Sequence, residues 1–421
     1  MKKNIFMISA AMLALVSCTK DEVIQINNGQ KIDFRTAMET RASVLEEGGL
    51  GSFYVTALNE SGQTYFSDIL FSKVENSIYF TSEDNYYWPD GELKFYAYYP
   101  SEEDLGGTVN ITGESQTLTG YTPAEDIADQ LDFITARASG DKKDESVALN
   151  FNHQLSQVEI NAFSKNEGYK IYVKAIRIKN AIKTGSFDFH SVEWSILEED
   201  NISDGDLTDY EIQITTPQEL SDQSVSLMGG KGSAMLIPQS RPAWEVEVEV
   251  EEEEEPNPNN QQNPMLTAEV DEPQEDNTTP EEGTVNDGEE DETPSTPVAT
   301  PGTYIAFLIQ VNTAAGVRVF PTTEGVDYAW VAKPMAFDWA PGYKYTYNCD
   351  FTDGLGVIAP DNFEDPDGDE DPIFPGGDDD PQPGDNVYGG KISVSVNFSS
   401  WNTNYSNDDE IYDSSHTVPM D

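Results

Sequence analysis

The chain has 421 residues, with 78 acidic and 23 basic side chains and a formal net charge of −55. This negative excess excludes a nucleic-acid-binding surface, because phosphate contacts need a basic patch. Residues 242–317 hold 20 acidic and no basic side chains, and residues 345–390 hold 13 acidic and none. Most of the excess charge therefore lies in two segments, and we expect the rest of the chain to be only moderately acidic.

The N-terminus has the composition of an export signal. Lys2 and Lys3 precede the apolar run 5–16, which is too short to span a bilayer. Ser17 directly before Cys18, with Leu15 three residues before the cysteine, resembles the lipobox of bacterial lipoproteins. That resemblance implies that a signal peptide, residues 1–17, is cut between Ser17 and Cys18, and that acyl chains on Cys18 anchor the protein. The alternative is an ordinary secretory signal cut near Ser17, with Cys18 incidental.

Further along, apolar and polar residues alternate with period two, which is typical of half-buried strands. The pattern is clear over 147–153 and 157–162. It continues at Ile171 and Val173, but Ile176 and Ile178 follow in the opposite phase, so we expect a β-bulge near Ala175. Later strands are expected over 305–311, 345–351 and 392–398.

No segment keeps a helical period, so helices should be few and short. Short strands separated by Gly, Asn, Asp and Pro turns indicate an all-β protein built of β-sandwich domains. We place an N-terminal domain at 43–182, after a segment 18–42, and a C-terminal domain at 186–400.

Two acidic segments interrupt the second domain, and a polar tail follows it. Residues 251–300 have few apolar side chains and dense like charge, so we expect an acidic disordered insertion. Residues 361–386 are expected to form an acidic linker, and residues 401–421 a tail poorly suited to packing. The run 365–369 departs from an EF-hand loop, so no metal site is expected.

The sequence offers little for catalysis. It has three histidines and none of the common nucleophile, zinc or nucleotide motifs, so we expect no enzyme activity and no cofactor. Cys349 is expected to be a buried thiol. The aromatic clusters 86–88 and 95–99 fit two interpretations: alternate side chains fill a core while the others lie on the outer face, or Trp88 and Tyr98 form a platform for glycans.

Three blocks together carry a resemblance to a known family. They are Trp88-Pro89 with the run 93–100 (LKFYAYYP), the run 149–158 (LNFNHQLSQV) and the run 339–347 (WAPGYKYTY). With the lipobox, they are similar to the fimbrillin family of lipoprotein precursors of type V pili. The resemblance implies two tandem transthyretin-like Greek-key β-sandwich domains. It also implies lipid-anchored display on the outer membrane or in a fimbrium.

The resemblance further implies how subunits would assemble. Lys20-Asp21-Glu22, which follows Cys18 closely, is similar to a surface-export tag. Lipoprotein-processing enzymes are among the implied partners. An arginine-specific protease would cut between Arg41 and Ala42 and remove the strand 23–34, whose Ile32 and Phe34 face inward. Another pilin subunit would then fill the groove by β-strand addition. The candidate donor residues are Ile392, Val394, Val396 and Phe398.

Three functions stay open from the sequence. The first is a structural pilus subunit or adhesin that assembles by strand exchange, with a ligand on a host or microbial surface. The second is a surface lipoprotein that binds glycans for nutrient capture. The third is a pilus anchor or tip protein that keeps its lipid, which the acidic insertion and the polar tail favour. The alternative to strand exchange is that the strand 392–398 pairs within its own domain and the protein stays monomeric.

Overall fold

The computed structural model describes residues 30–36, 49–245, 302–363, 373, 381–389 and 392–401, and the backbone of the strand His416–Met420. In this part of the chain nearly all regular structure is β-strand. Its one α-helix, α1, is the single turn Glu102–Leu105, and the turns η1 (Glu199–Asn201), η2 (Asp204–Asp206) and η3 (Pro360–Asn362) are 3-10 helices. The expectation of a mostly β protein with few, short helices is confirmed. No helix among these residues is long and apolar enough to cross a membrane.

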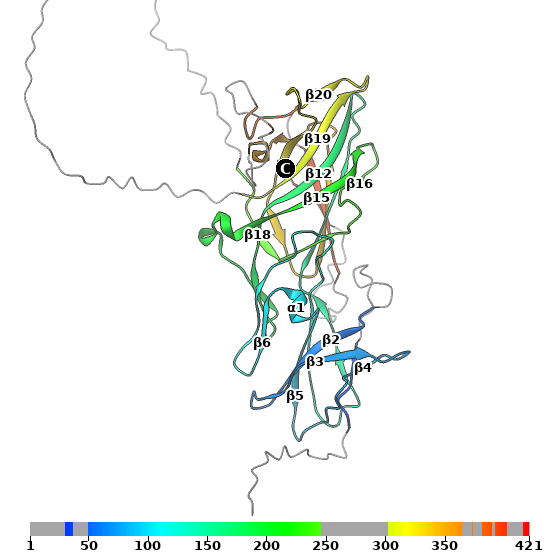
Figure 1. Ribbon diagram of the computed structural model, residues 1–421, viewed down its shortest axis with the longest axis vertical. Helices are drawn as coiled ribbons and strands as arrows, with labels where there is room; N and C mark the ends of the chain where they lie inside the picture. The colour runs from blue at the N-terminus through cyan, green and yellow to red at the C-terminus, as the bar shows by residue number, and fades with distance from the viewer. Residues whose placement is uncertain are drawn as a thin grey trace, which may run out of the picture.

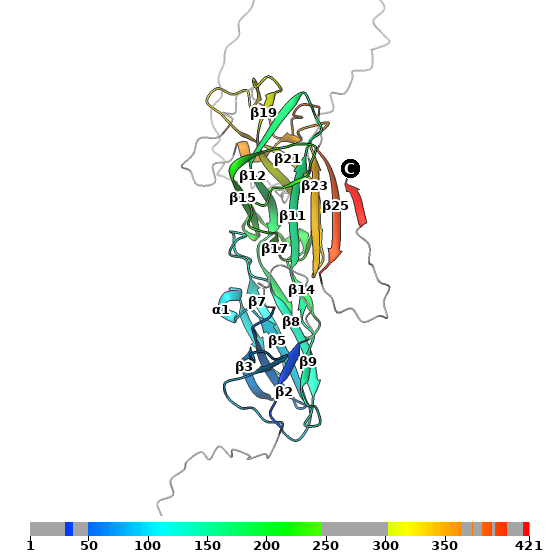
Figure 2. The same cartoon turned by 90° about the vertical axis from the view of Figure 1, so that its right-hand side faces the viewer.

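The molecule is elongated, with two groups of sheets stacked along its long axis (Figures 1 and 2). The lower group in these views contains an eight-stranded sheet and a four-stranded sheet. The first has the order β10 (Asn152–His153), β8 (Ile134–Gly140), β5 (Leu93–Tyr99), β2 (Ser52–Asn59), β3 (Thr64–Lys73), β4 (Tyr79–Thr81), β1 (Phe34–Thr36), β9 (Val147–Leu149). The second has the order β14 (Glu193–Ser195), β13 (Gly185–Asp188), β7 (Gln116–Tyr121), β6 (Thr108–Ile111).

Strand β5 is buried on both faces, which differs from the expected division into inner and outer aromatic residues. Phe95 packs in one core with Phe53 and Phe71. Tyr96 and Tyr98 point to the other face, into a second core shared with apolar residues of the four-stranded sheet. That second sheet covers the face that would otherwise meet solvent, and its long-range packing cannot be read from the alternation of β5 alone.

The upper group contains two six-stranded sheets and a two-stranded one. One sheet has the order β16 (Val225–Ser226), β11 (Ser156–Phe163), β23 (Tyr343–Asp350), β25 (Ser393–Ser400), β26 (His416–Met420), and β17 (Ala234–Leu236) also pairs with β11. The other has the order β15 (Leu207–Glu219), β12 (Tyr169–Ile182), β19 (Tyr304–Thr313), β21 (Ala329–Pro334), β24 (Val357–Ile358), and β20 (Arg318–Phe320) also pairs with β19. The third joins β18 (Gln239–Arg241) and β22 (Phe337–Trp339). The inward side chains of the two large sheets form one core.

The bulge expected near Ala175 is confirmed. The register of β12 with both of its neighbours shifts between Val173 and Ala175. The shift lets Ile171 and Val173 on one side, and Ile176 and Ile178 on the other, all lie in the core.

The expected boundary between the N-terminal and C-terminal domains, at residues 182–186, stays a prediction. The sheets themselves do not divide there: β11 and β12 precede it but pair with strands of the upper group, whereas β13 and β14 follow it and belong to the lower group. The chain therefore crosses between the two groups more than once.

The expectation of a C-terminal tail that does not pack is wrong in two places. Trp401 is partly buried against a core of the lower group. Residues His416–Met420 add a strand to β25, from the pair Val394 with Met420 to the pair Phe398 with His416. The unpaired backbone groups at the edge of β25 let the end of an otherwise polar tail join the sheet by backbone pairing.

Candidate functional site

The described part of the N-terminal segment forms a strand inside the lower group of sheets. Phe34 of β1 pairs with Phe80 of β4 in antiparallel fashion and with Val147 of β9 in parallel fashion. Ile32 precedes the strand and donates its backbone N–H to the Tyr86 carbonyl at 2.8 Å. This short segment thus closes a gap between two strands that lie far from it in sequence.

The side chains of this segment fill the centre of a core. Ile32 and Phe34 are both fully buried. The Phe34 ring meets the rings of Phe71 and Phe95 edge to face, with centroids 4.7 and 5.1 Å apart. Burial of two such side chains contributes roughly 3–6 kcal/mol, at about 1.5–3 kcal/mol each. The segment is thus a substantial part of the core although β1 has only three residues.

The N-terminal candidate residues lie outside the described residues. These are Ser17 and Cys18 at the signal junction, Lys20, Asp21 and Glu22, and Arg41 with Ala42. Arg35 is described: it pairs with Tyr79 and Ala148 within the sheet, with its side chain exposed. A protease must draw its substrate out of a sheet to cut it, so the paired backbone of Arg35 is a poor target.

The four donor candidates lie on or next to β25. Ile392, Val394 and Val396 are buried in the upper core, and Phe398 is half-buried beside the Tyr345 ring. The strand pairs with β23 on one side and with β26 on the other. In this conformation the expected donor is therefore paired within its own chain.

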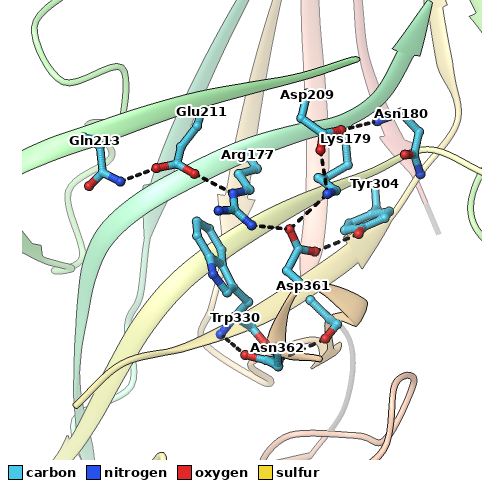
Figure 3. Close-up of polar contacts among 11 residues, drawn as sticks. Arg177, Lys179, Asn180, Asp209, Glu211, Gln213, Tyr304, Trp330, Asp361 and Asn362 are labelled. Atoms are coloured by element: carbon cyan, nitrogen blue, oxygen red, sulfur yellow. Dashed lines mark hydrogen bonds and ion pairs between the residues drawn. The ribbon is translucent and has the colours of Figure 1, made fainter. Parts of the chain in front are cut away.

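Ahead of this strand, a buried ion network holds the chain at Asp361 (Figure 3). Its carboxylate accepts hydrogen bonds from Arg177 Nη1 at 2.7 Å and from the Tyr304 hydroxyl at 2.7 Å, and Lys179 Nζ lies 3.3 Å away. Burial raises the pKa of Asp361, but Lys179, Arg177 and Tyr304 outweigh it and hold the pKa below its usual value. The carboxylate is thus kept charged inside the protein.

The next residue strengthens this attachment. The Asn362 side chain accepts the Trp330 N–H at 2.8 Å and donates to the Trp330 and Ala359 carbonyls at 2.7 and 3.0 Å. The expected acidic linker 361–386 is therefore wrong at its start, where Asp361 and Asn362 are buried. Apart from Ala359, the hydrogen-bond partners named here lie more than 30 residues away in sequence, so composition alone could not reveal them.

Most rings of the aromatic clusters 86–88 and 95–99 lie in or against a core, and Tyr87 is the exposed one. Trp88 and Tyr98 are buried, and so are Phe95 and Tyr96. The glycan interpretation is wrong for Trp88 and Tyr98, since a buried ring offers no face to a sugar. Cys349 is also fully buried, and burial raises the pKa of its thiol to about 12. Within the described ranges, no three His, Cys, Asp or Glu side chains are grouped to hold a metal ion.

Comparison with known proteins places this geometry in context. A model of the family described as fimbrillin-like matches residues 40–268, which is more than half of the chain. A fimbrial protein from Bacteroides vulgatus has a similar fold, with a TM-score of 0.50 and 11% identity over 88% of this chain and 99% of that one. The fimbrial anchor protein Mfa2 from Porphyromonas gingivalis matches with a TM-score of 0.31 and 9% identity over 76% of this chain and 90% of that one. A search of curated protein sequences finds no significant match. By the extent of the family match, this chain belongs to the fimbrillin-like family.

Proposed function

We propose that this protein is a non-enzymatic pilus subunit or pilus-associated adhesin, displayed on the cell surface and assembled by strand exchange. In this proposal acylated Cys18 delivers it to the outer membrane, with Lys20-Asp21-Glu22 as the export tag, and a protease cuts between Arg41 and Ala42. The two groups of sheets would be two tandem transthyretin-like domains. Membership of the fimbrillin-like family supports surface display among other pilus components.

The observation that carries the proposal is the place of β1. It pairs with β4 and β9, and its neighbour Ile32 and its own Phe34 lie at the centre of the core. Its loss would leave two unpaired strand edges beside an apolar slot, which is a template for strand addition.

Cutting after Arg41 would change the balance that keeps β1 in place. The two buried side chains contribute roughly 3–6 kcal/mol. A separate peptide must also overcome about 4–15 kcal/mol of lost translational and rotational freedom to stay bound. A cut thus converts a stable strand into a ligand that leaves readily. This supports proteolysis as the step that starts assembly.

Strand β25 has the chemistry that the slot needs. Ile392, Val394 and Val396 present apolar side chains with period two, as Ile32 and Phe34 do. While β1 fills the neighbour's slot, β25 would lose its own burial on leaving its sheet and gain none in the neighbour, so donation is unfavourable. An empty slot removes this penalty, because β25 then gains in the neighbour about as much burial as it loses in its own sheet.

The network around Asp361 would fix where the donor segment begins. Because Arg177 and Lys179 of β12 and Tyr304 of β19 hold Asp361, the turn η3 would stay attached to these two strands when β25 departs. Backbone bonds of Asp385 to Ile358 and of Val387 to Leu355 and Gly356 extend this hold. The residues between Val387 and Ile392 would then be the tether that spans two subunits.

The test is assembly by the purified full-length chain after treatment with an arginine-specific protease. We expect a ladder of oligomers that survives mild detergent and collapses on boiling. The Arg41→Ala variant should give no ladder, whereas Arg35→Ala should behave as the wild type. If the wild type stays monomeric after cleavage at Arg41 and loss of β1, strand exchange is wrong. N-terminal sequencing of protein from cells then separates a filament subunit, which starts at Ala42, from an anchor that keeps acylated Cys18.

A further inference from the structure

Six of the eleven exposed large apolar side chains among the described residues lie in two places. The first, here called the hairpin patch, consists of Val74, Ile78 and Tyr79 at the turn between β3 and β4. The second, the turn patch, consists of Tyr169, Val317 and Tyr388. Ile78 and Val317, each about three-fifths exposed at 61% and 62%, are the most exposed large apolar side chains of the described residues.

Contacts between three chain segments bring the residues of the turn patch together. Tyr169 pairs with Thr313, and the Thr313 N–H donates to the Val317 carbonyl at 2.7 Å. The Tyr388 ring lies 5.6 Å from the Tyr169 ring, and its hydroxyl donates to the Val319 carbonyl at 2.8 Å. The patch is thus built on the β19–β20 turn, which lies at the upper end of the molecule (Figure 1).

The hairpin patch lies beside the proposed acceptor slot. Tyr79 pairs with Arg35, and its neighbour Phe80 pairs with Phe34 of β1. Adjacent strands are about 4.8 Å apart, so Tyr79 is one strand away from whatever occupies the place of β1. The β3–β4 hairpin projects sideways from the lower half of the molecule (Figure 1).

The turn patch lies at the base of the proposed donor. Tyr388 precedes Ile392 by four residues, and four residues span at most about 14 Å. Backbone bonds between Val387 and both Leu355 and Gly356 hold this base to the upper group of sheets. In the register that puts Ile392 of one copy at the position of Phe34 in the next, Tyr388 lies within about 14 Å of that position, and therefore near the β3–β4 hairpin.

From these two placements we infer that the hairpin patch of one copy packs against the turn patch of the next copy in the assembled filament. This inference rests on the proposed strand exchange and adds the side-chain contact that accompanies it. The two patches are different surfaces, so the contact is heterologous and repeats without closing into a dimer. Apolar side chains exposed in the monomer gain by burial at such a contact.

The experiment compares four versions of the full-length chain: wild type, Ile78→Ser, Val317→Ser and the double variant. Each is treated with the arginine-specific protease, and two quantities are measured. One is the rate of ladder formation, and the other is the affinity of the cleaved chain for a synthetic peptide of residues 390–400. Leu197→Ser is the matched control, because Leu197 is exposed at 43% and belongs to neither patch.

We expect each patch variant to slow ladder formation about tenfold or more, while peptide affinity and the Leu197→Ser control stay at the wild-type level. The double variant should be little slower than either single variant, because the two side chains contribute to one contact. Unchanged ladders with normal peptide binding would overturn the patch contact alone. Fully additive losses would also overturn it, since each patch would then meet something else. A peptide that binds no cleaved chain would instead overturn strand exchange, and the patch contact with it.

Discussion

The indole ring of Trp401 lies on the imidazole ring of His153, with ring centroids 4.1 Å apart and planes inclined by 19°. Trp401 directly follows β25, whereas His153 ends β10 in the eight-stranded sheet. His153 is fixed in turn by Asp132, whose Oδ2 lies 2.5 Å from Nδ1. The end of the proposed donor strand is thus tied to the other group of sheets, so release of β25 requires this contact to break.

We therefore expect Trp401→Ala to loosen β25. The loss of a partly buried aromatic contact should cost about 1–3 kcal/mol and speed amide hydrogen exchange across Ser393–Ser400. Hydrogen exchange followed by mass spectrometry measures this, with Trp401→Phe as the control that keeps an aromatic ring. Unchanged exchange in β25 together with normal stability would show that Trp401 does not hold the strand.

Phe34→Ala should destabilise the intact chain by about 3–5 kcal/mol, because it leaves a cavity among Phe53, Phe71 and Phe95. Urea unfolding measures this, with Arg35→Ala, an exposed residue of the same strand, as the control. After cleavage and loss of β1, wild type and the Phe34→Ala variant should become equally stable, because the cleaved chains no longer contain residue 34. A difference that persists in purified, cleaved chains would mean that β1 stays bound.

Asp361→Asn should destabilise the protein by about 3 kcal/mol. The substitution removes the charge that Arg177 and Lys179 face in a buried setting, while Glu211 and Asp209 still partner these two cations. The matched control is Asp204→Asn, an exposed acid near Lys179. Urea unfolding at pH 7 tests the prediction, and equal stability of the two variants would contradict it.

The same pair of proteins should show a defined dependence on pH. The pKa of Asp361 is lowered in the folded state, so its stabilising effect is present above the usual aspartate value of 3.8. That effect is lost as the pH falls through the lower, folded-state pKa. The stability gap between wild type and Asp361→Asn should therefore be constant from pH 7 to about pH 5 and shrink only in strong acid. A gap that already closes at pH 5 would mean that the folded-state pKa is not lowered.

Features that depend on local alternation could be predicted from the sequence. The strands over 305–311 and 345–351 and the bulge near Ala175 follow from the phase of apolar residues, because a one-residue slip exchanges the faces of a strand. The burial of Cys349 follows from the same alternation. In each case the apolar residues that alternate along one strand mark the face of the sheet that is buried.

Features that depend on distant partners could not be predicted in this way. Asp361 reads as one more acid in an acidic run, and only the fold brings Arg177 and Lys179 to it. Trp401 stood at the start of a polar tail, and its stacking partner lies 248 residues upstream in a different sheet. An isolated tryptophan in a polar segment was the one available signal, because such a large apolar surface seldom stays in water.

Cys349 offers a direct test of whether β25 leaves its sheet. It pairs with Val394 across β23 and β25 and is completely buried, and burial raises the pKa of its thiol to about 12. At pH 8 the reactive thiolate is then on the order of 10⁻⁴ of the total. In a Cys18→Ser background, modification by a thiol reagent should be roughly 1,000-fold slower in the folded monomer than in urea.

Donation of β25 would uncover the side of β23 that carries this thiol. Ladders formed after cleavage should therefore react much faster at Cys349 than uncleaved monomers do, and the Arg41→Ala variant should keep the slow rate under the same treatment. The site of modification is confirmed by mass spectrometry of the peptide that contains Cys349. If Cys349 stays as protected in the ladder as in the monomer, the subunits are joined by some strand other than β25, because a departed β25 cannot shield its former partner.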